Sequence, residues 1–359
     1  MRLGGGIIRD IIFLFFSFEV FGGVFVSSIF NCVSNTVLSG SNDKDVFFNI
    51  HGKNVKINCG KGDDEVCSYF SNVVTVNGEA GNDYIKTIGC NYGLISGGKG
   101  NDSIENSKTG FKINVSEYGG FYKTISGDEG DDYIENYGHH SLIYGGTGYD
   151  RIYNYSPYVT IYGGNGNDTI ENIEKSVISD GISGISGIKS VVYGGKGNEY
   201  ISNSAHEVTI SGGKGNDYIS ENGDRYYSKN LIQYKSGDGN DTIVGFNSSD
   251  TLQITKGSYK VTTKGNDVIV KVGKGKIILK YAKGIEISIQ DSKGKVTTKT
   301  YGSSSSQTAE LFAENNFVTV DNLSEITKNN LTPTALEKIT TQNFENLTSE
   351  NNFVTYSEK

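Results

Sequence analysis

The sequence has little of what disulfide-stabilised, collagen-like or proline-rich chains use. Its 359 residues include no tryptophan, one methionine and two prolines. The four cysteines, Cys32, Cys59, Cys67 and Cys90, form no Cys-x-x-Cys pair. Free or buried thiols are therefore the simpler interpretation, with a zinc site or a disulfide as the alternative. Abundant glycine without proline or a strict triplet excludes collagen and proline-rich linkers.

Basic residues are in the minority, since 33 Lys and Arg oppose 41 Asp and Glu and the net charge is -8. A nucleic-acid partner needs a basic stripe that neutralises phosphates, so nucleic acid is not expected as a main partner. The acidic balance is compatible with the binding of cations. The abundant residues are glycine, with 48 copies, and tyrosine, with 23, together with many β-branched residues. This composition predicts an all-β chain of short strands joined by tight turns.

A long hydrophobic run occurs at the N-terminus. Arg2 and Arg9 precede the apolar run Ile11–Phe18, which loosely imitates a signal peptide. The apolar character continues for ~20 residues, the length that a membrane helix needs, but Glu19 and Gly22–Gly23 interrupt it. Three interpretations stay open: a signal, a membrane anchor, or a buried cap for the segment that follows.

One glycine-rich octapeptide recurs along most of the chain. The copies are CGKGDDEV (59–66), GEAGNDYI (78–85), GGKGNDSI (97–104), GDEGDDYI (127–134), GGTGYDRI (145–152), GGNGNDTI (163–170), GGKGNEYI (194–201), GGKGNDYI (212–219) and SGDGNDTI (236–243). Their acidic residues are separated by 19, 19, 30, 18, 18, 31, 18 and 24 positions. A repeat period near 18 predicts a stacked array rather than an ordinary globular core.

Each copy has an aliphatic residue two positions after its acid, and nearly every copy has another two positions before its first glycine. Between turns the chain reads as strand, bend and strand, as in DRIYNYSPYVTIYGG. One coil thus makes two strands, and successive coils pair in parallel and bury two aliphatic columns. Five asparagines share one place in the repeat and are expected to form a structural amide ladder: Asn106, Asn136, Asn154, Asn172 and Asn203.

The turn itself indicates a cation. A phosphate loop needs a helix start and usually a Lys or Ser/Thr after the glycines, whereas Asp168 would repel phosphate and Thr169–Ile170 begins a strand. Glycine allows a positive φ that points carbonyl oxygens inward, and the aspartate adds a charged oxygen. Calcium takes about 6–8 oxygen ligands, which two turns stacked one coil apart can supply together.

These copies resemble the G-G-x-G-x-D-x-U-x nonapeptide of RTX (haemolysin-type) calcium-binding proteins over about residues 55–245. The resemblance implies a right-handed parallel β-roll, a β-solenoid with roughly five or six calcium ions along one edge. The implied carboxylate ligands are Asp64, Asp83, Asp102, Asp132, Asp150, Asp168, Glu199, Asp217 and Asp241. The implied carbonyl ligands are Gly97, Gly98, Gly100, Gly130, Gly145, Gly146, Gly148, Gly163, Gly164, Gly166, Gly212, Gly213, Gly215 and Gly239.

Some copies depart from the family pattern. Glu199 replaces the aspartate, Glu79 and Asp128 replace the second glycine, and Cys59 and Ser236 replace the first. Sites at these copies are less certain, and the long gaps after the third and sixth copies carry insertions that could divide the ion row into blocks. The opposite bends have no glycine–aspartate signature.

The remaining segments suggest four regions: an apolar N-terminal segment (1–38), the β-roll (39–245), an antiparallel β cap (246–301) and a polar tail (302–359). The tail is similar to the secretion signals of type I exported RTX proteins, with plain disorder as the alternative. No HExxH or GxSxG motif is present, so an enzyme is not expected.

Two functions remain. The first is a secreted, extracellular structural or adhesive protein whose folding calcium drives, with the cell surface and the type I secretion machinery as further partners. The second is a membrane-active toxin of the same family that uses the apolar N-terminal segment. A membrane partner therefore stays open.

Overall fold

The computed structural model describes residues 19–21, 24–107, 122–173, 176–179, 182–185, 189–223 and 228–302. The chain divides into two units, Met1–Ser304 and Ser305–Lys359, and only the first contains described residues. Residues 1–18, much of both insertions and the tail with its predicted secretion signal lie outside the described residues.

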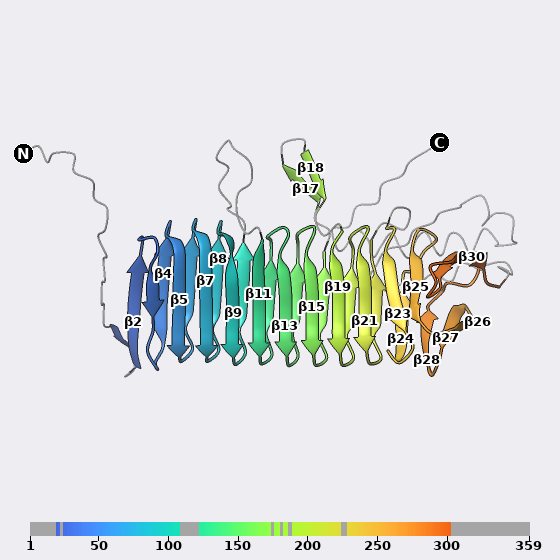
Figure 1. Cartoon of the computed structure of the whole chain (residues 1–359), viewed down its shortest axis with the longest axis horizontal. Coiled ribbons are helices and arrows are strands. Elements are labelled where there is room, and N and C mark those ends of the chain that lie inside the picture. Colours follow the sequence, from blue (N-terminus) through green and yellow to red (C-terminus); the bar gives the residue numbers. More distant parts are fainter. Residues whose placement is uncertain are drawn as a thin grey trace, which may run out of the picture. The chain divides into compact units, whose positions relative to one another are not determined.

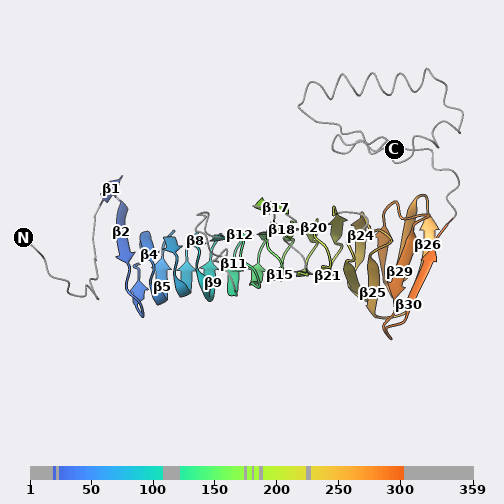
Figure 2. The same cartoon turned by 90° about the horizontal axis from the view of Figure 1, so that it is seen from above.

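Two sheets of stacked strands face each other, and the described residues contain no helix (Figures 1 and 2). The 15-stranded sheet holds, in spatial order, β1 (Glu19–Phe21), β2 (Val24–Asn31), β4 (Asp45–Ile50), β6 (Glu65–Tyr69), β8 (Tyr84–Ile88), β10 (Ser103–Ser107), β12 (Tyr133–Asn136), β14 (Arg151–Asn154), β16 (Thr169–Asn172), β20 (Tyr200–Asn203), β22 (Tyr218–Glu221), β24 (Asn240–Val244), β28 (Gly275–Leu279), β27 (Asp267–Val272) and β26 (Tyr259–Lys264). The 13-stranded sheet holds β3 (Val37–Ser39), β5 (Lys53–Lys61), β7 (Asn72–Ala80), β9 (Asn91–Lys99), β11 (Lys123–Glu129), β13 (Leu142–Thr147), β15 (Thr160–Asn165), β19 (Val191–Lys196), β21 (Thr209–Lys214), β23 (Leu231–Lys235), β25 (Thr251–Lys256), β29 (Glu286–Gln290) and β30 (Val296–Thr300). A separate hairpin joins β17 (Ser176–Ser179) to β18 (Ile182–Ile185).

Each coil contributes one strand to each sheet, and neighbouring coils pair in parallel from β2 to β28 and from β3 to β29. The predicted parallel β-solenoid is therefore confirmed. The stack begins at β2, within the segment 1–38 that the sequence analysis treats separately.

Aliphatic side chains fill the space between the sheets, one from each strand of a coil. Ile134 lies in register with Ile104 and Ile152 in one sheet, and Ile143 with Ile161 in the other. All five side chains are completely buried. Since burying one such side chain contributes about 1.5–3 kcal/mol, each coil is stabilised by its contact with the next rather than by itself.

The amide ladder predicted from the five asparagines is confirmed. Each asparagine donates from Nδ2 to Oδ1 of the next, at 2.8 Å for Asn106–Asn136, 2.9 Å for Asn136–Asn154, 2.8 Å for Asn154–Asn172 and 2.8 Å for Asn172–Asn203. Glu221 ends the ladder, because its Oε2 accepts from Asn203 at 3.1 Å.

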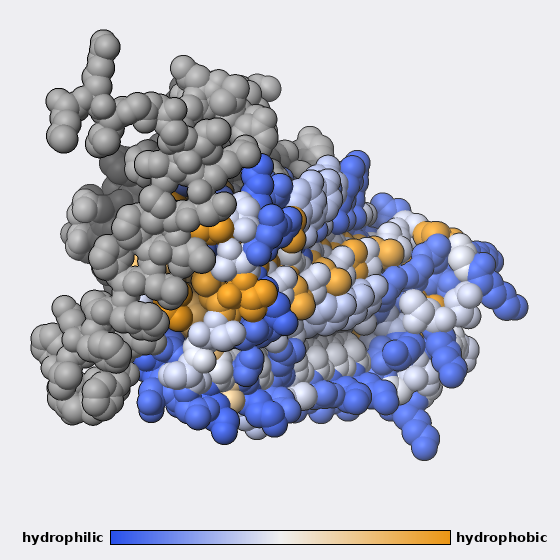
Figure 3. Space-filling model, turned by 60° about the vertical axis from the view of Figure 1, so that its left-hand side comes forward, coloured by the Kyte–Doolittle hydropathy of each residue, from blue (hydrophilic) through white to orange (hydrophobic). Residues whose placement is uncertain are grey.

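Both ends of the stack carry antiparallel strands. β1 pairs with β2 at one end, while β26–β27–β28 and β29–β30 form the predicted cap at the other. Along the sides, residues of similar hydropathy form rows that follow the stack, because equivalent positions of each coil lie in register (Figure 3).

Two features differ from the sequence analysis. The insertions follow β10 and β16, at the edge opposite the glycine turns, so they leave the pairing of β10 with β12 and of β16 with β20 intact. In the last copy, Ile232 rather than Tyr234 continues the aliphatic column, since Ile232 pairs with Ile210. Two extra residues precede this turn, and the sheet register shifts at Tyr234–Lys235.

Candidate metal centre

The glycine turns connect each strand of the 13-stranded sheet to the next strand of the 15-stranded sheet, and they stack backbone on backbone. Gly164, near the end of β15, and Gly166, which follows β15, have φ of 124° and 138°. A Cβ atom at either position would collide with the carbonyl oxygen of Gly146 or Gly148 in the preceding coil. Only glycine combines this backbone conformation with so close an approach.

The acidic residues of the turns form one buried column. One carboxylate oxygen of each column aspartate from Asp64 to Asp241 accepts a hydrogen bond from the backbone N–H of the acid in the preceding coil, whereas Glu199 accepts none. Asp150 accepts from Asp132 at 3.0 Å, and Asp168 accepts from Asp150 at 3.1 Å. Every predicted carboxylate belongs to this column, and each side chain is at most 4% exposed.

The second carboxylate oxygen has no hydrogen-bond partner. This is true of Oδ2 in Asp64, Asp83, Asp102, Asp132, Asp150, Asp168 and Asp217, and of both carboxylate oxygens in Glu199. An unpaired buried carboxylate oxygen is costly, and such atoms in a native fold point to an ion or water that the protein is built to hold.

A carbonyl oxygen of the following coil lies beside the orphaned oxygens of six of these eight acids. A Cβ atom at Gly97 would collide with both Asp102 Oδ2 and the carbonyl oxygen of Gly127, so the missing side chain leaves a cradle lined by oxygens. The same cradle recurs in six successive pairs: Asp83 with Gly97, Asp102 with Gly127, Asp132 with Gly145, Asp150 with Gly163, Asp168 with Gly194, and Glu199 with Gly212.

Electrostatics oppose ionisation of this column in the absence of a cation. Burial, strengthened by the neighbouring carboxylates, raises the pKa of Asp102 to about 8 and that of Asp150 to about 7. Burial alone raises the pKa of Asp168 to about 6. A cation in the row would stabilise the charged form and reverse these shifts.

The donor set fits calcium. Across the described ranges, no three His, Cys, Asp or Glu side chains come together closely enough to hold a metal by themselves. Carbonyl oxygens must therefore complete the ligand set, and calcium accepts a mixture of carboxylate and carbonyl oxygens in flexible geometry. The residues that would hold it are the column acids and the first glycine of the next turn.

The structure differentiates the predicted glycine ligands. The first glycines, Gly97, Gly145, Gly163 and Gly212, place their carbonyl oxygens at the cradles. A Cβ atom at any of the predicted glycines with positive φ would collide with a carbonyl oxygen of the preceding coil: Gly98, Gly100, Gly130, Gly146, Gly148, Gly164, Gly166, Gly213, Gly215 and Gly239. These glycines permit the close stacking of turns, and their carbonyl groups stay predicted ligands.

The last turn departs from the pattern. Asp241 still accepts from the N–H of Asp217 at 3.1 Å, but the three atoms nearest to a Cβ atom at Gly212 all belong to Asp217. The hydroxyl of buried Tyr234 donates to the carbonyl oxygen of Gly239 at 2.6 Å. The six cradles described above therefore end with the pair of Glu199 and Gly212.

Sequence reasoning missed one member of the column. Asp45 is 1% exposed, and its N–H donates to Asp64 Oδ1 at 2.7 Å. The signal was present, since Gly40 and Asp45 lie 19 residues before Cys59 and Asp64. It was obscured because Ser41 replaces the second glycine of the turn and the aliphatic position holds a phenylalanine.

Glu199 differs from the aspartates of the column, although its coil keeps the regular strand register. Its longer side chain lies against Gly194 and Gly197, and both of its carboxylate oxygens lack partners. Burial and the nearby Asp217 carboxylate raise its pKa strongly. The extra methylene therefore leaves the cradle in place with its charged oxygens poorly positioned.

The edge opposite the glycine turns is built differently. Tyr122, His140 and Tyr158 have φ of 55°, 55° and 58°, and their rings stack at 5.0 and 4.9 Å between centroids. These three successive bends thus use stacked aromatic rings where the turn edge uses stacked glycines, whereas Lys189 and Glu207 form an ion pair at two later bends.

This fold and this column define a class, a β-solenoid with one buried carboxylate per coil facing the carbonyl groups of the next. The model of the RTX calcium-binding nonapeptide repeat (4 copies) matches residues 159–171 and 235–253. The chain carries RTX repeats, and calcium is the ion that these repeats bind.

Among solved structures, the chain is similar to the extracellular lipase LipA from Serratia marcescens, with 14% sequence identity and a TM-score of 0.26. The match covers 71% of this chain and 40% of the lipase chain. A TM-score this low carries no argument about function. No curated protein matches the chain.

Proposed function

We propose that this chain is a secreted, non-catalytic structural or adhesive protein whose β-roll folds when it meets extracellular calcium. The observation that carries the proposal is the row of buried carboxylate oxygens without partners, six of whose eight acids lie beside a carbonyl oxygen of the next coil. A row of negative oxygens without donors is unstable unless cations separate its members.

Calcium would then act as the switch of folding. Each coil buries little apolar surface by itself and needs another source of stability. The free energy of metal binding therefore contributes directly to the free energy of folding, as in other small metal-dependent domains. Extracellular calcium modules bind at roughly 10⁻⁴–10⁻³ M, a concentration range that is met outside cells and not in the cytosol. The chain would stay unfolded and exportable until it leaves the cell, which supports the type I route and an extracellular or cell-surface location.

A structural role also accounts for the buried polar side chains. The acids of the turn column and the amides of the ladder recur once per coil. A catalytic site would instead gather different groups at one place in the fold, so we propose that the chain is not an enzyme.

Far-UV circular dichroism of the full chain tests this function directly. We expect a disordered spectrum in chelator and β structure after addition of millimolar calcium, with magnesium as the control ion. Magnesium demands near-ideal octahedral geometry and gives up water reluctantly, so it should not induce the fold at the same concentration. A chain with the same β spectrum in chelator would refute the proposal.

The toxin alternative rests on the apolar N-terminal residues. No helix among the described residues is long and apolar enough to cross a membrane. Release of dye from lipid vesicles distinguishes the two functions, since the structural protein should leave vesicles intact with and without calcium. Calcium-dependent leakage that disappears on deletion of residues 1–30 would favour the toxin.

A further inference from the structure

Positive charge is concentrated in residues 251–301, at the C-terminal end of the described part of this acidic chain. Residues 251–301 contain eleven lysines and three acidic residues, although the chain as a whole has a net charge of -8. Asp267 forms an ion pair with Lys280 at 2.8 Å. For the other ten lysines of this segment, the described residues show no ion pair.

Three of these lysines lie directly opposite one another on adjacent strands. Lys260 of β26 pairs with Lys271 of β27, and Lys271 pairs with Lys276 of β28. Like charges directly opposite on neighbouring strands are destabilising. The row is therefore a local cost of the fold that an anionic partner would remove.

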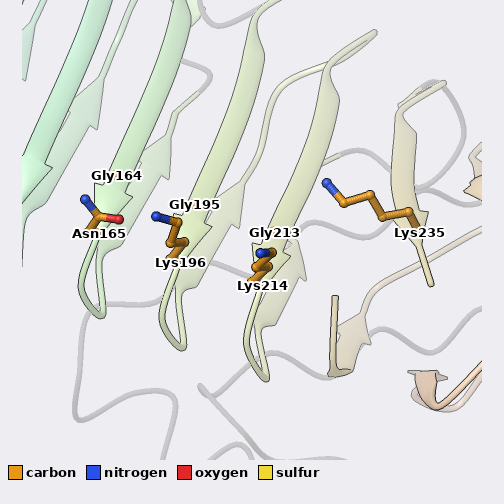
Figure 4. Close-up of a pocket in the computed structure, with 7 residues that line it drawn as sticks. All are labelled: Gly164, Asn165, Gly195, Lys196, Gly213, Lys214 and Lys235. Atoms are coloured by element: carbon orange, nitrogen blue, oxygen red, sulfur yellow. The ribbon is translucent and has the colours of Figure 1, made fainter. Parts of the chain in front are cut away.

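A second row flanks the same edge on the 13-stranded sheet. Lys196 and Lys214 pair in register on β19 and β21, and Lys235 pairs with Lys256 on β23 and β25. Figure 4 shows Lys196 and Lys214 at equivalent positions of successive strands, with Lys235 beyond them. They line an open groove of about 360 Å³ whose floor is the backbone of three glycines, Gly164, Gly195 and Gly213.

The two rows belong to one edge of the roll. Lys276 follows the last glycine turn, since it pairs with Asn240, and Lys274 lies in the turn that joins β27 to β28. That turn touches Ser236 of the last glycine turn, because a Cβ atom at Gly273 would collide with Ser236 Oγ. We call this group the basic edge: Lys196, Lys214, Lys235, Lys256, Lys260, Lys271, Lys274 and Lys276.

Little negative charge is exposed at the basic edge. Asp238 lies 3.9 Å from Lys235, and its side chain is 3% exposed. The column acids that underlie the edge, such as Asp217 and Asp241, are also buried. When calcium is bound, these acids are neutralised and the edge becomes more positive still.

We propose that the basic edge is a docking surface for a linear anionic polysaccharide that carries sulfate or carboxylate groups. Lysines of adjacent strands repeat about every 4.8 Å, so a flexible chain with one charge per sugar can follow a row. Lysine is a strongly hydrated point charge that suits diffuse contacts, and the basic edge contains no arginine for bidentate recognition.

A nucleic acid fits this surface less well. Duplex DNA carries one charge per about 1.7 Å of helix axis, far denser than either row. Single strands are held by exposed aromatic faces on which bases stack. The tyrosines beside the row lysines do not offer such faces, because Tyr234 is buried and Tyr259 packs against the core. Binding of DNA is therefore an outcome that the experiment must separate from binding of polysaccharide.

The test measures binding of fluorescent dextran sulfate to the full-length chain in saturating calcium, over a series of salt concentrations. Two triple variants remove one row each: Lys260→Gln/Lys271→Gln/Lys276→Gln and Lys196→Gln/Lys214→Gln/Lys235→Gln. The matched control, Lys44→Gln/Lys53→Gln/Lys56→Gln, removes the same charge from exposed lysines at the N-terminal end of the roll. Neutral dextran and a DNA duplex are the control polymers.

We expect the wild-type chain and the control variant to bind dextran sulfate equally, and each row variant to bind on the order of ten-fold more weakly at low salt. The slope of log affinity against log salt should fall by about 2 for each lost row, because each lost contact releases about 0.7 fewer counterions. Circular dichroism in calcium confirms that the variants fold. Equal loss in all three variants, no binding by the wild type, or tighter binding of DNA through the same lysines would overturn the proposal.

The docking surface rests on the proposed function in one respect only: the roll that carries it must be folded. If the chain folds equally in chelator, the same binding series can be run without calcium. A loss of binding in the row variants would then uphold the docking surface while the calcium switch fails. Conversely, calcium-driven folding without dextran sulfate binding would leave the switch and remove the docking surface.

Discussion

The number of bound ions is the sharpest quantity that the structure predicts. Six cradles combine an acidic side chain with a glycine carbonyl of the next coil. If each binds calcium with a dissociation constant of about 10⁻³ M, then 10 mM calcium supplies about 1.4 kcal/mol for each cradle. Six sites together supply about 8 kcal/mol, which is comparable to the whole stability of an ordinary domain. Removal of calcium should therefore unfold the roll rather than loosen it.

Titration calorimetry combined with circular dichroism measures this stoichiometry. We expect six ions per chain and a folding transition that coincides with binding. Asp150→Asn keeps the size of the side chain but removes the charge from the middle of the row. This variant should lose at least one ion and need a higher calcium concentration to fold.

Glu171→Gln is the matched control, because it removes one negative charge from β16 outside the column. It should keep six ions and the wild-type folding midpoint. A stoichiometry of one ion, or equal effects of Asp150→Asn and Glu171→Gln, would refute the model of one site between each pair of coils.

Three further predictions concern single residues and pH. First, the calcium-free roll should gain stability as the pH falls from 8 to 5. The folded-state pKa of Asp102 is raised to about 8 and that of Asp168 to about 6, above their ordinary value, so the folded chain takes up protons first. Calcium affinity should fall over the same range, because ligands must be deprotonated. Circular dichroism in chelator should therefore show more β structure at pH 5 than at pH 8 while calorimetry shows weaker calcium binding, and less β structure at pH 5 would contradict this. Second, Glu199→Asp should restore the regular column and tighten calcium binding several-fold in calorimetry, whereas an unchanged affinity would show that the methylene is harmless. Third, Glu79→Gly should raise the free energy of unfolding by about 1 kcal/mol, since Glu79 has φ of 73° where most copies have glycine. Urea denaturation in calcium measures this change, and destabilisation would mean that the Glu79 side chain makes a stabilising contact.

The regular part of the fold could be predicted from the sequence because each position of the repeat has the same structural role in every coil. Side chains such as Ile152 and Asn154 recur at fixed intervals, so spacing alone predicts their columns. The acids were predictable for the same reason, and a carboxylate at a glycine turn favours a cation over a phosphate.

The parts that could not be predicted break the periodicity. The two additional residues around Tyr234 change the register within one coil, and spacing between acids does not show where additional residues are placed. The basic edge was hidden by the net charge, which averages an acidic roll with a lysine-rich cap. Its rows become visible only when strand pairing brings Lys260, Lys271 and Lys276 side by side.

The hydrogen bonds of the acid column and of the amide ladder run in one direction, which gives the roll two chemically different ends. The backbone N–H of Asp132 donates to Asp150, that of Asp150 donates to Asp168, and the ladder amides likewise donate toward the C-terminus. A stack that is cut on its N-terminal side therefore exposes carboxylate and amide oxygens as acceptors, whereas a stack that is cut on its C-terminal side exposes N–H donors. Each end of the roll thus requires a cap of its own chemistry.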